Sequence, residues 1–211
     1  MRRIVIFGSN AIAKKCYNII VKEKNLIVFL NPKSLVGNYY LGFSIKHNKI
    51  FKKKIIKKFE KGIVNFHNGE LPRFRGLYSI YHTIRLQHKL KIKYFYITIH
   101  FVNEKIDSGM IIKKFKILLN KHETADSLYK KTEKKIIEIF KKMHKKLIWK
   151  SIDAKKQHGN SMYFNKNSIN YFLDLNESKE NIEAHIRALI FNKKEQAKIK
   201  IGNLNLKLIK S

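Results

Sequence analysis

Cysteine and proline are nearly absent from this chain. Its 211 residues include one cysteine, Cys16, and two prolines. A single cysteine excludes an internal disulfide framework and a cysteine-based metal site. With so little proline and only nine glycines, no stretch has the composition of a linker or a low-complexity tract. Hydrophobic residues make up 44% of the chain, which predicts a globular protein with a core of its own.

Long apolar runs are also missing. No run approaches the length of a membrane span. The amino terminus is basic and then apolar, but its apolar run stops at Gly8, which is too short for the core of a signal peptide. We therefore expect a cytoplasmic protein without a membrane partner.

Negative charge is scarce. The chain has 15 acidic and 46 basic residues and a formal net charge of +31, which often accompanies nucleic-acid or anionic-membrane binding. Only six of the basic residues are arginine, and Ile and Asn are abundant, as A/T-rich codons would produce. Lysines spread over every predicted helix indicate solvated faces rather than a binding patch. We expect no nucleic-acid partner, although a phosphate-bearing substrate would be attracted.

The first apolar run opens an α/β pattern. Residues 4–7 predict a strand, and residues 11–23 predict a helix after a tight turn, the beginning of a doubly wound, Rossmann-like, mostly parallel sheet. The turn Gly8, Ser9 and Asn10 is not a Gly-x-Gly-x-x-Gly loop, so it does not indicate a dinucleotide site. Two interpretations stay open: Asn10 is a helix N-cap, or the helix N-terminus binds a substrate phosphate.

Further elements follow from periodicity and turn residues. We predict strands at 26–30, 39–45, around 65 and at 97–102, a strand pair at 110–119, helices at 50–59 and 78–86, and an inserted loop or hairpin at 87–96. Thr124 can cap a long amphipathic helix over 125–149. Its inner stripe would be Leu128, Ile136, Phe140, Met143 and Leu147.

The pattern changes near residue 158. We expect a Rossmann-like domain over 1–157 and a small α+β appendage over 158–211. Gly202 and Asn203 lie between two alternating runs within 197–209, which predicts a β-hairpin.

Two polar motifs stand out from this framework. Asn65 and His67 are two residues apart at the end of an apolar run, so on a strand their side chains share a face. Ends of strands are where open α/β sheets place their active sites. A lone Asn-x-His more often marks a buried strand whose histidine pairs with a carbonyl. The second motif, residues 97–112, contains His100 and Asp107.

In this order the two stretches resemble the signature of the folate-dependent formyltransferases. That signature runs Asn-x-His, then Leu-Pro-x-x-Arg-Gly (here residues 71–76), and later a His-x-Val and an Ile-Asp-x-Gly step. The resemblance implies formyl transfer from N10-formyltetrahydrofolate to a small-molecule primary amine, without a metal. The tail and residues 128–131 look most like sugar-nucleotide N-formyltransferases, in which a helix matching residues 186–189 precedes the hairpin; 1–157 would then be the catalytic domain. A glycinamide ribonucleotide or methionyl-tRNA formyltransferase-like enzyme stays open, as does a degenerate member that binds nucleic acid or other anions through its lysines.

The same resemblance assigns roles to three residues. Asn65 would donate its amide to the developing oxyanion, and His67 would donate as well or shuttle a proton. Asp107 would fix the His67 tautomer and raise its pKa, or take the amine proton through water. For His100, simple structural pairing in its strand is the favoured interpretation.

Binding residues follow less directly. Ile50 and Phe51 fall where the family lines its pterin pocket, although ordinary helix core is the favoured alternative. Asn103 and Asp107 would also contact the donor, and Gly8, Ser9 and Asn10 would hold a substrate phosphate. No spacing of His, Asp and Glu supplies the three or four convergent ligands that a metal needs. Whether the protein is a homodimer stays open.

Overall fold

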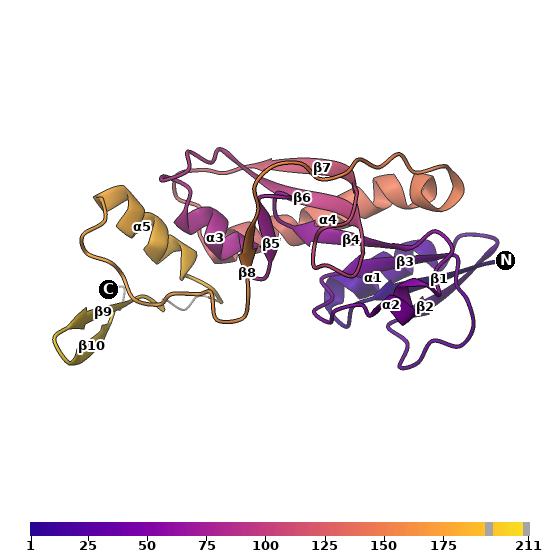
Figure 1. The fold of residues 1–211 in the computed structure, drawn as a ribbon, viewed down its shortest axis with the longest axis horizontal. Helices are drawn as coiled ribbons and strands as arrows, with labels where there is room; N and C mark the ends of the chain where they lie inside the picture. Colours follow the sequence, from indigo (N-terminus) through magenta and orange to yellow (C-terminus); the bar gives the residue numbers. More distant parts are fainter. Residues whose placement is uncertain (193–195, 209–211) are drawn as a thin grey trace.

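One six-stranded sheet organises the computed structural model, whose described residues are 1–192 and 196–208. Its strands are β1 (Arg2–Phe7), β2 (Leu26–Leu30), β3 (Leu41–Ile45), β4 (Ile63–Asn68), β6 (Tyr94–Phe101) and β7 (Ile111–Leu118). They lie in the order β2-β1-β3-β4-β6-β7 (Figure 1). The first four are parallel, whereas β6 pairs antiparallel with β4 and β7 antiparallel with β6. The fold is therefore α/β with a mostly parallel sheet, as the sequence predicts.

Helices cover both faces of this sheet. The described helices are α1 (Ala11–Ile20), α2 (Lys53–Ile56), α3 (Ser79–Arg85), α4 (Ala125–Trp149) and α5 (Lys179–Ala188), of which α5 packs against α3 rather than on the sheet. The main core lies between the sheet and α1 and α4, and a smaller one packs β1 and β4 against α2. The expected cap and inner stripe of α4 are confirmed: Thr124 accepts from the Ser127 N–H, and all five predicted stripe residues are buried.

Several predicted boundaries are wrong. The helix expected over 50–59 is confined to the four residues of α2, and β3 begins at Leu41 rather than at residue 39. Within the stretch 110–119, residues 111–118 form one strand, β7, that pairs with β6, not a strand pair. The expected insertion at 87–96 is a turn followed by the start of β6, because Tyr94 already pairs with Leu118.

The C-terminal segment contacts the sheet domain through a strand pair, a helix pair and several hydrogen bonds. β5 (Phe74–Gly76) pairs in parallel with β8 (Met162–Phe164), and α5 lies beside α3 (Figure 1), where the Tyr81 hydroxyl meets His185 Nε2 at 3.0 Å. The predicted hairpin is present as β9 (Lys198–Ile201) and β10 (Leu204–Lys207). Residues 193–195 and 209–211 of the predicted appendage lie outside the described residues, and the division at 157 stays a prediction.

Among the helices that the structure describes, not one combines the length and apolar character needed to cross a bilayer.

Substitution of Phe140 on α4 tests the packing of the main core. Its buried ring contacts Phe43 and Phe66, with ring centroids 5.1 Å and 5.8 Å away. We expect Phe140→Ala to lower the free energy of unfolding by about 3–5 kcal/mol, because the cavity adds to the lost burial. The exposed neighbour Lys141→Ala should change it by less than about 0.5 kcal/mol. Urea denaturation measures both, and similar values for the two variants would contradict this packing.

Candidate active site

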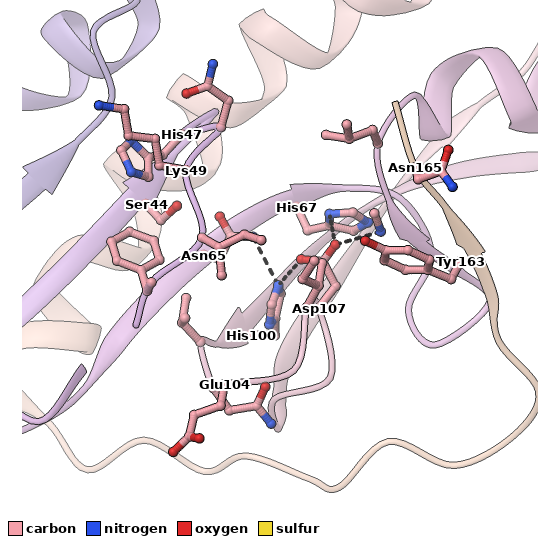
Figure 2. A pocket seen from close by; sticks show the side chains of 18 of the residues that line it. Ser44, His47, Lys49, Asn65, His67, His100, Glu104, Asp107, Tyr163 and Asn165 are labelled. Atoms are coloured by element: carbon pink, nitrogen blue, oxygen red, sulfur yellow. Dashed lines mark hydrogen bonds and ion pairs between the residues drawn. The ribbon is translucent and has the colours of Figure 1, made fainter. Parts of the chain in front are cut away.

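A cavity of about 410 Å³ opens at the end of β3 and β4. Ser44, Asn65, His67 and His100 reach it from the sheet, and Asp107 reaches it from the loop after β6 (Figure 2). All three residues predicted to be catalytic therefore line one space. The other described lining residues are His47, Asn48, Lys49, Ile50, Phe51, Gly76, Leu77, Val102, Asn103, Glu104, Ile106, Tyr163, Asn165 and Lys166.

Asn65 and His100 form a polar pair across β4 and β6. The two residues are direct partners in the antiparallel ladder, and Asn65 Nδ2 lies 3.1 Å from His100 Nε2. His100 Nδ1 lies 2.8 Å from the Phe101 carbonyl, to which it donates. In the neutral ring Nε2 then accepts from Asn65, whose second N–H is left for a ligand. His100 is thus paired, as the sequence argument favours, but it is also part of the cavity wall.

Asp107 lies between the two histidines. Its Oδ2 is 3.4 Å from His67 Nδ1 and accepts the Gly76 N–H at 2.9 Å. Its Oδ1 is 3.5 Å from His100 Nε2. Figure 2 shows both rings directed at this carboxylate. The 3.4 and 3.5 Å separations are longer than well-formed hydrogen bonds, and each attracts the carboxylate when the facing ring nitrogen carries a proton.

The loop that carries Asp107 is fixed to its surroundings. The Gln157 amide donates to the Asp107 carbonyl at 2.9 Å and to the Gly109 carbonyl at 2.7 Å. Arg75 holds Gln157 in turn, because its Nη2 donates to Oε1 at 2.8 Å. Gly109 passes so close to β6 that an added Cβ would lie 1.8 Å from the Phe101 carbonyl oxygen.

A backbone carbonyl fixes the tautomer of His67. Nε2 donates to the Phe74 oxygen at 2.8 Å, so in the neutral ring Nδ1 has a lone pair that faces Asp107. Burial lowers the His67 pKa, with help from His100, and this outweighs the opposite effects of Asp107 and the Phe74 carbonyl. The expectation is therefore right that Asp107 contributes to raising the His67 pKa. The net effect of all the surroundings, however, is to lower that pKa.

The Asp107 carboxyl group is held in its ionised form. Burial by itself would raise its pKa, but His67, His100 and the Gly76 N–H together lower the pKa to about 2. An isolated carboxylate of such low pKa is a weak base near neutral pH. A proton that arrives here is shared with the lone pair on His67 Nδ1, so the two groups act as one acceptor.

The opposite wall of the cavity is apolar and aromatic. The Phe51 ring packs against Phe7 and His47, with centroids 4.8 Å and 5.0 Å away. Ile50 is 68% exposed and precedes α2, so the favoured interpretation of Ile50 and Phe51 as ordinary helix core is wrong for Ile50. This wall, facing the polar groups of Asn65, fits a flat heteroaromatic ring such as that of a folate.

Of four further residues in the cavity lining, the sequence predicted one and did not predict the other three. Asn103, expected in the donor site, lines the cavity and accepts from the Ser108 hydroxyl at 2.8 Å. Tyr163, Asn165 and Lys166 were not foreseen. They arrive because β8 pairs with β5, and nothing in their local sequence marks that long-range contact.

The turn after β1 lies apart from these residues. Gly8, Ser9 and Asn10 border a separate hollow of about 320 Å³. The Asn10 side chain accepts from the Ala13 N–H at 2.9 Å and donates to the Ile45 carbonyl at 3.0 Å, so it is the N-cap of α1. Phosphate binding by this turn stays a prediction.

Within the described ranges, 1–192 and 196–208, no group of three or more His, Cys, Asp and Glu side chains is arranged to hold a metal ion.

The sequence is similar to that of known formyltransferases. Residues 44–143 match the family model described as Formyl transferase. Methionyl-tRNA formyltransferase of Buchnera aphidicola subsp. Acyrthosiphon pisum (strain Tuc7) is 33% identical over 146 residues, which are 68% of this chain and 45% of that protein. The chain thus spans about half the length of this relative.

Two solved structures share the fold over almost the whole chain. A 4-N formyltransferase from Francisella tularensis superposes with a TM-score of 0.84 at 20% identity and covers 98% of this chain and 96% of its own. The N-formyltransferase from Helicobacter canadensis, in complex with folinic acid and dTDP-3-aminofucose, has a TM-score of 0.77 at 22% identity, with 96% and 85% covered. Residues 44–143 are thus similar in sequence to the formyl transferase family, and almost the whole chain shares the fold of these N-formyltransferases.

Gly109 provides a test of the Asp107 loop. An added methyl group would collide with the Phe101 carbonyl, so we expect Gly109→Ala to lower the free energy of unfolding by about 1–3 kcal/mol. Gly202→Ala is the matched control, because a Cβ at that hairpin turn meets nothing within 4 Å and only its positive φ resists the change. Chemical denaturation compares them; a Gly109→Ala protein as stable as the wild type would show that the loop is not fixed as described.

Proposed function

We propose that this protein transfers a formyl group from N10-formyltetrahydrofolate to the primary amine of a nucleotide-linked amino sugar. The observation that carries the proposal is the single cavity in which Asn65, His67 and Asp107 face an aromatic wall. The related Helicobacter canadensis structure contains folinic acid and dTDP-3-aminofucose, which supports the same pair of ligands here.

The donor would lie along the apolar wall. Ile50, Phe51 and His47 offer flat or apolar surface for its ring system, and Asn103 offers a polar group at the rim. When bound, the donor supplies a formyl group that exchanges its bond to a folate nitrogen for one to the acceptor amine. The Asn65 N–H that His100 does not use donates to the formyl oxygen as negative charge develops there.

His67 and Asp107 together would accept and return the proton. The amine must lose a proton as it attacks, and the folate nitrogen must gain one as it leaves. The lone pair on His67 Nδ1 and the Asp107 carboxylate lie 3.4 Å apart, so a proton entering between them is held by both. The same pair can return it to the leaving nitrogen. His67 keeps its orientation throughout because Nε2 donates to a main-chain oxygen.

Two acceptors have specific support. The Helicobacter canadensis structure, which contains dTDP-3-aminofucose, covers 96% of this chain, which favours an amino sugar on a nucleotide. The Buchnera relative favours methionyl-tRNA as the second candidate. In the first case we propose that both substrates are small cytoplasmic molecules and that no nucleic acid takes part.

Substitution of the three polar residues tests the mechanism. Asn65→Ala should lower turnover by about 10²-fold or more, the usual effect of losing an oxyanion donor. His67→Ala and Asp107→Asn should also be strongly impaired, and a double variant should lose little more because the residues act together. His122→Ala is the control, since His122 is exposed on the loop before α4. A folded Asp107→Asn protein with near-normal turnover would refute these roles.

A panel of amines tests the acceptor. With N10-formyltetrahydrofolate as donor, we expect mass spectrometry to show formylation of a nucleotide-linked 3- or 4-amino sugar. The free amino sugar should react far more slowly, because binding of the nucleotide positions the amine. Formylation of methionyl-tRNA or glycinamide ribonucleotide, with every nucleotide sugar inert, would reject this acceptor while leaving the reaction class intact.

A further inference from the structure

One of the three proposed catalytic residues has an unusual backbone conformation. Asp107 has φ 51°, in the left-handed region that residues with a side chain seldom adopt. A conformation of this kind persists where surrounding contacts fix it, and it is most common at functional sites. The loop after β6 therefore needs contacts from outside itself to keep the Asp107 carboxylate between His67 and His100.

A glutamine from a distant segment makes such contacts. Gln157 lies beyond α4, 50 residues after Asp107 in the chain, and outside the stretch 44–143 that matches the formyl transferase model. Its side-chain nitrogen donates to the Asp107 carbonyl at 2.9 Å and to the Gly109 carbonyl at 2.7 Å. Both N–H groups of one planar amide are thus used on main-chain oxygens of the loop that carries the carboxylate.

The oxygen end of the same amide is anchored on β5. Arg75 Nη2 donates to Gln157 Oε1 at 2.8 Å. Because a guanidinium group can only donate and a carbonyl can only accept, a single orientation of the amide satisfies all three partners. Gly76, the residue after Arg75, donates its N–H to the Asp107 carboxylate at 2.9 Å. Adjacent residues of β5 therefore hold the side chain of Asp107 directly and its main chain through Gln157.

We propose that Gln157 is a positioning residue for formyl transfer, whose amide holds the main chain of Asp107 so that the carboxylate faces both histidines. Gln157 is not among the described residues that line the catalytic cavity, so it acts through Asp107 and not on a substrate. The proposal rests on the function proposed above. It also adds to the reaction a residue from the segment that follows α4.

Loss of the two donated hydrogen bonds has a defined consequence for the carboxylate. A released loop lets the carboxylate move away from His67, His100 and the Gly76 N–H, the groups that lower the pKa of Asp107 to about 2. That pKa should then rise toward its ordinary value of 3.8. Because the proton acceptor is less often in place, kcat should fall, and KM for the formyl donor should change less than kcat.

Gln157→Met tests this role, because methionine has a similar length and no charge but cannot donate. We expect kcat to fall about 10- to 100-fold, the usual effect of a small misplacement. The ¹³C resonance of the Asp107 carboxyl group should titrate above its wild-type midpoint, and circular dichroism should show a folded protein. Gln87→Met is the matched control, since Gln87 follows α3 and its Oε1 is 3.5 Å from Arg187. It should leave kcat and the Asp107 midpoint unchanged.

Gln157→Glu separates donation from anchoring. Above neutral pH the new carboxylate still accepts from Arg75 but has no N–H for the two carbonyls, so kcat should stay low. Wild-type kcat in this variant would overturn the proposal. A folded Gln157→Met protein with wild-type kcat, or with the wild-type Asp107 midpoint, would also overturn it. If Gln157→Met does not fold, kcat of Gln157→Glu supplies the test. A wild type that formylates no amine would reject the proposed function, whereas the NMR titration would still test the positioning of Asp107.

Discussion

The ionised carboxylate of Asp107 is the group on which the geometry of the catalytic cavity depends. It faces His67 on one side and His100 on the other, and it accepts the N–H of Gly76. Burial of a single charge without these partners would be strongly unfavourable. Together these contacts outweigh burial and lower the pKa of the carboxyl group to about 2, and the contribution of His67 is made when its Nδ1 holds a proton between the two groups.

Four separate parts of the chain must meet for this carboxylate to be held. β4 supplies His67 and β6 supplies His100 through one antiparallel ladder. β5 supplies the Gly76 N–H, and Gln157 clamps the loop from beyond α4. Gly76 lies against β8, where an added Cβ would be 2.1 Å from the Phe164 carbonyl oxygen. The catalytic geometry is therefore coupled to the segment after residue 157, which also brings Tyr163 to the cavity rim.

Local sequence was sufficient to predict the features of the fold that depend on local periodicity. The two-residue spacing of Asn65 and His67 placed them on one face of β4, and the stripe from Leu128 with its Thr124 cap defined α4. Local sequence was insufficient where a main-chain atom, or the pairing of two segments far apart in the chain, determines the geometry of the site. The Phe74 carbonyl that fixes His67 has no sequence signature, and the contact of β8 with β5 spans more of the chain than any motif. The prediction of a helix over 50–59 was wrong because the apolar residues of this stretch line the cavity or pack into the smaller core.

The pKa of Asp107 tests the central claim most directly. Selective ¹³C labelling of aspartate, with Asp107→Asn used to assign its signal, allows the carboxyl resonance to be followed by NMR through an acid titration. A midpoint of about 2, with the fold retained, is the expected result, because two histidines and a main-chain N–H stabilise the charge. A midpoint at or above the ordinary value of 3.8 would show that the effect of burial exceeds that of the three contacts. It would contradict the stabilised carboxylate on which the proposed proton transfer depends.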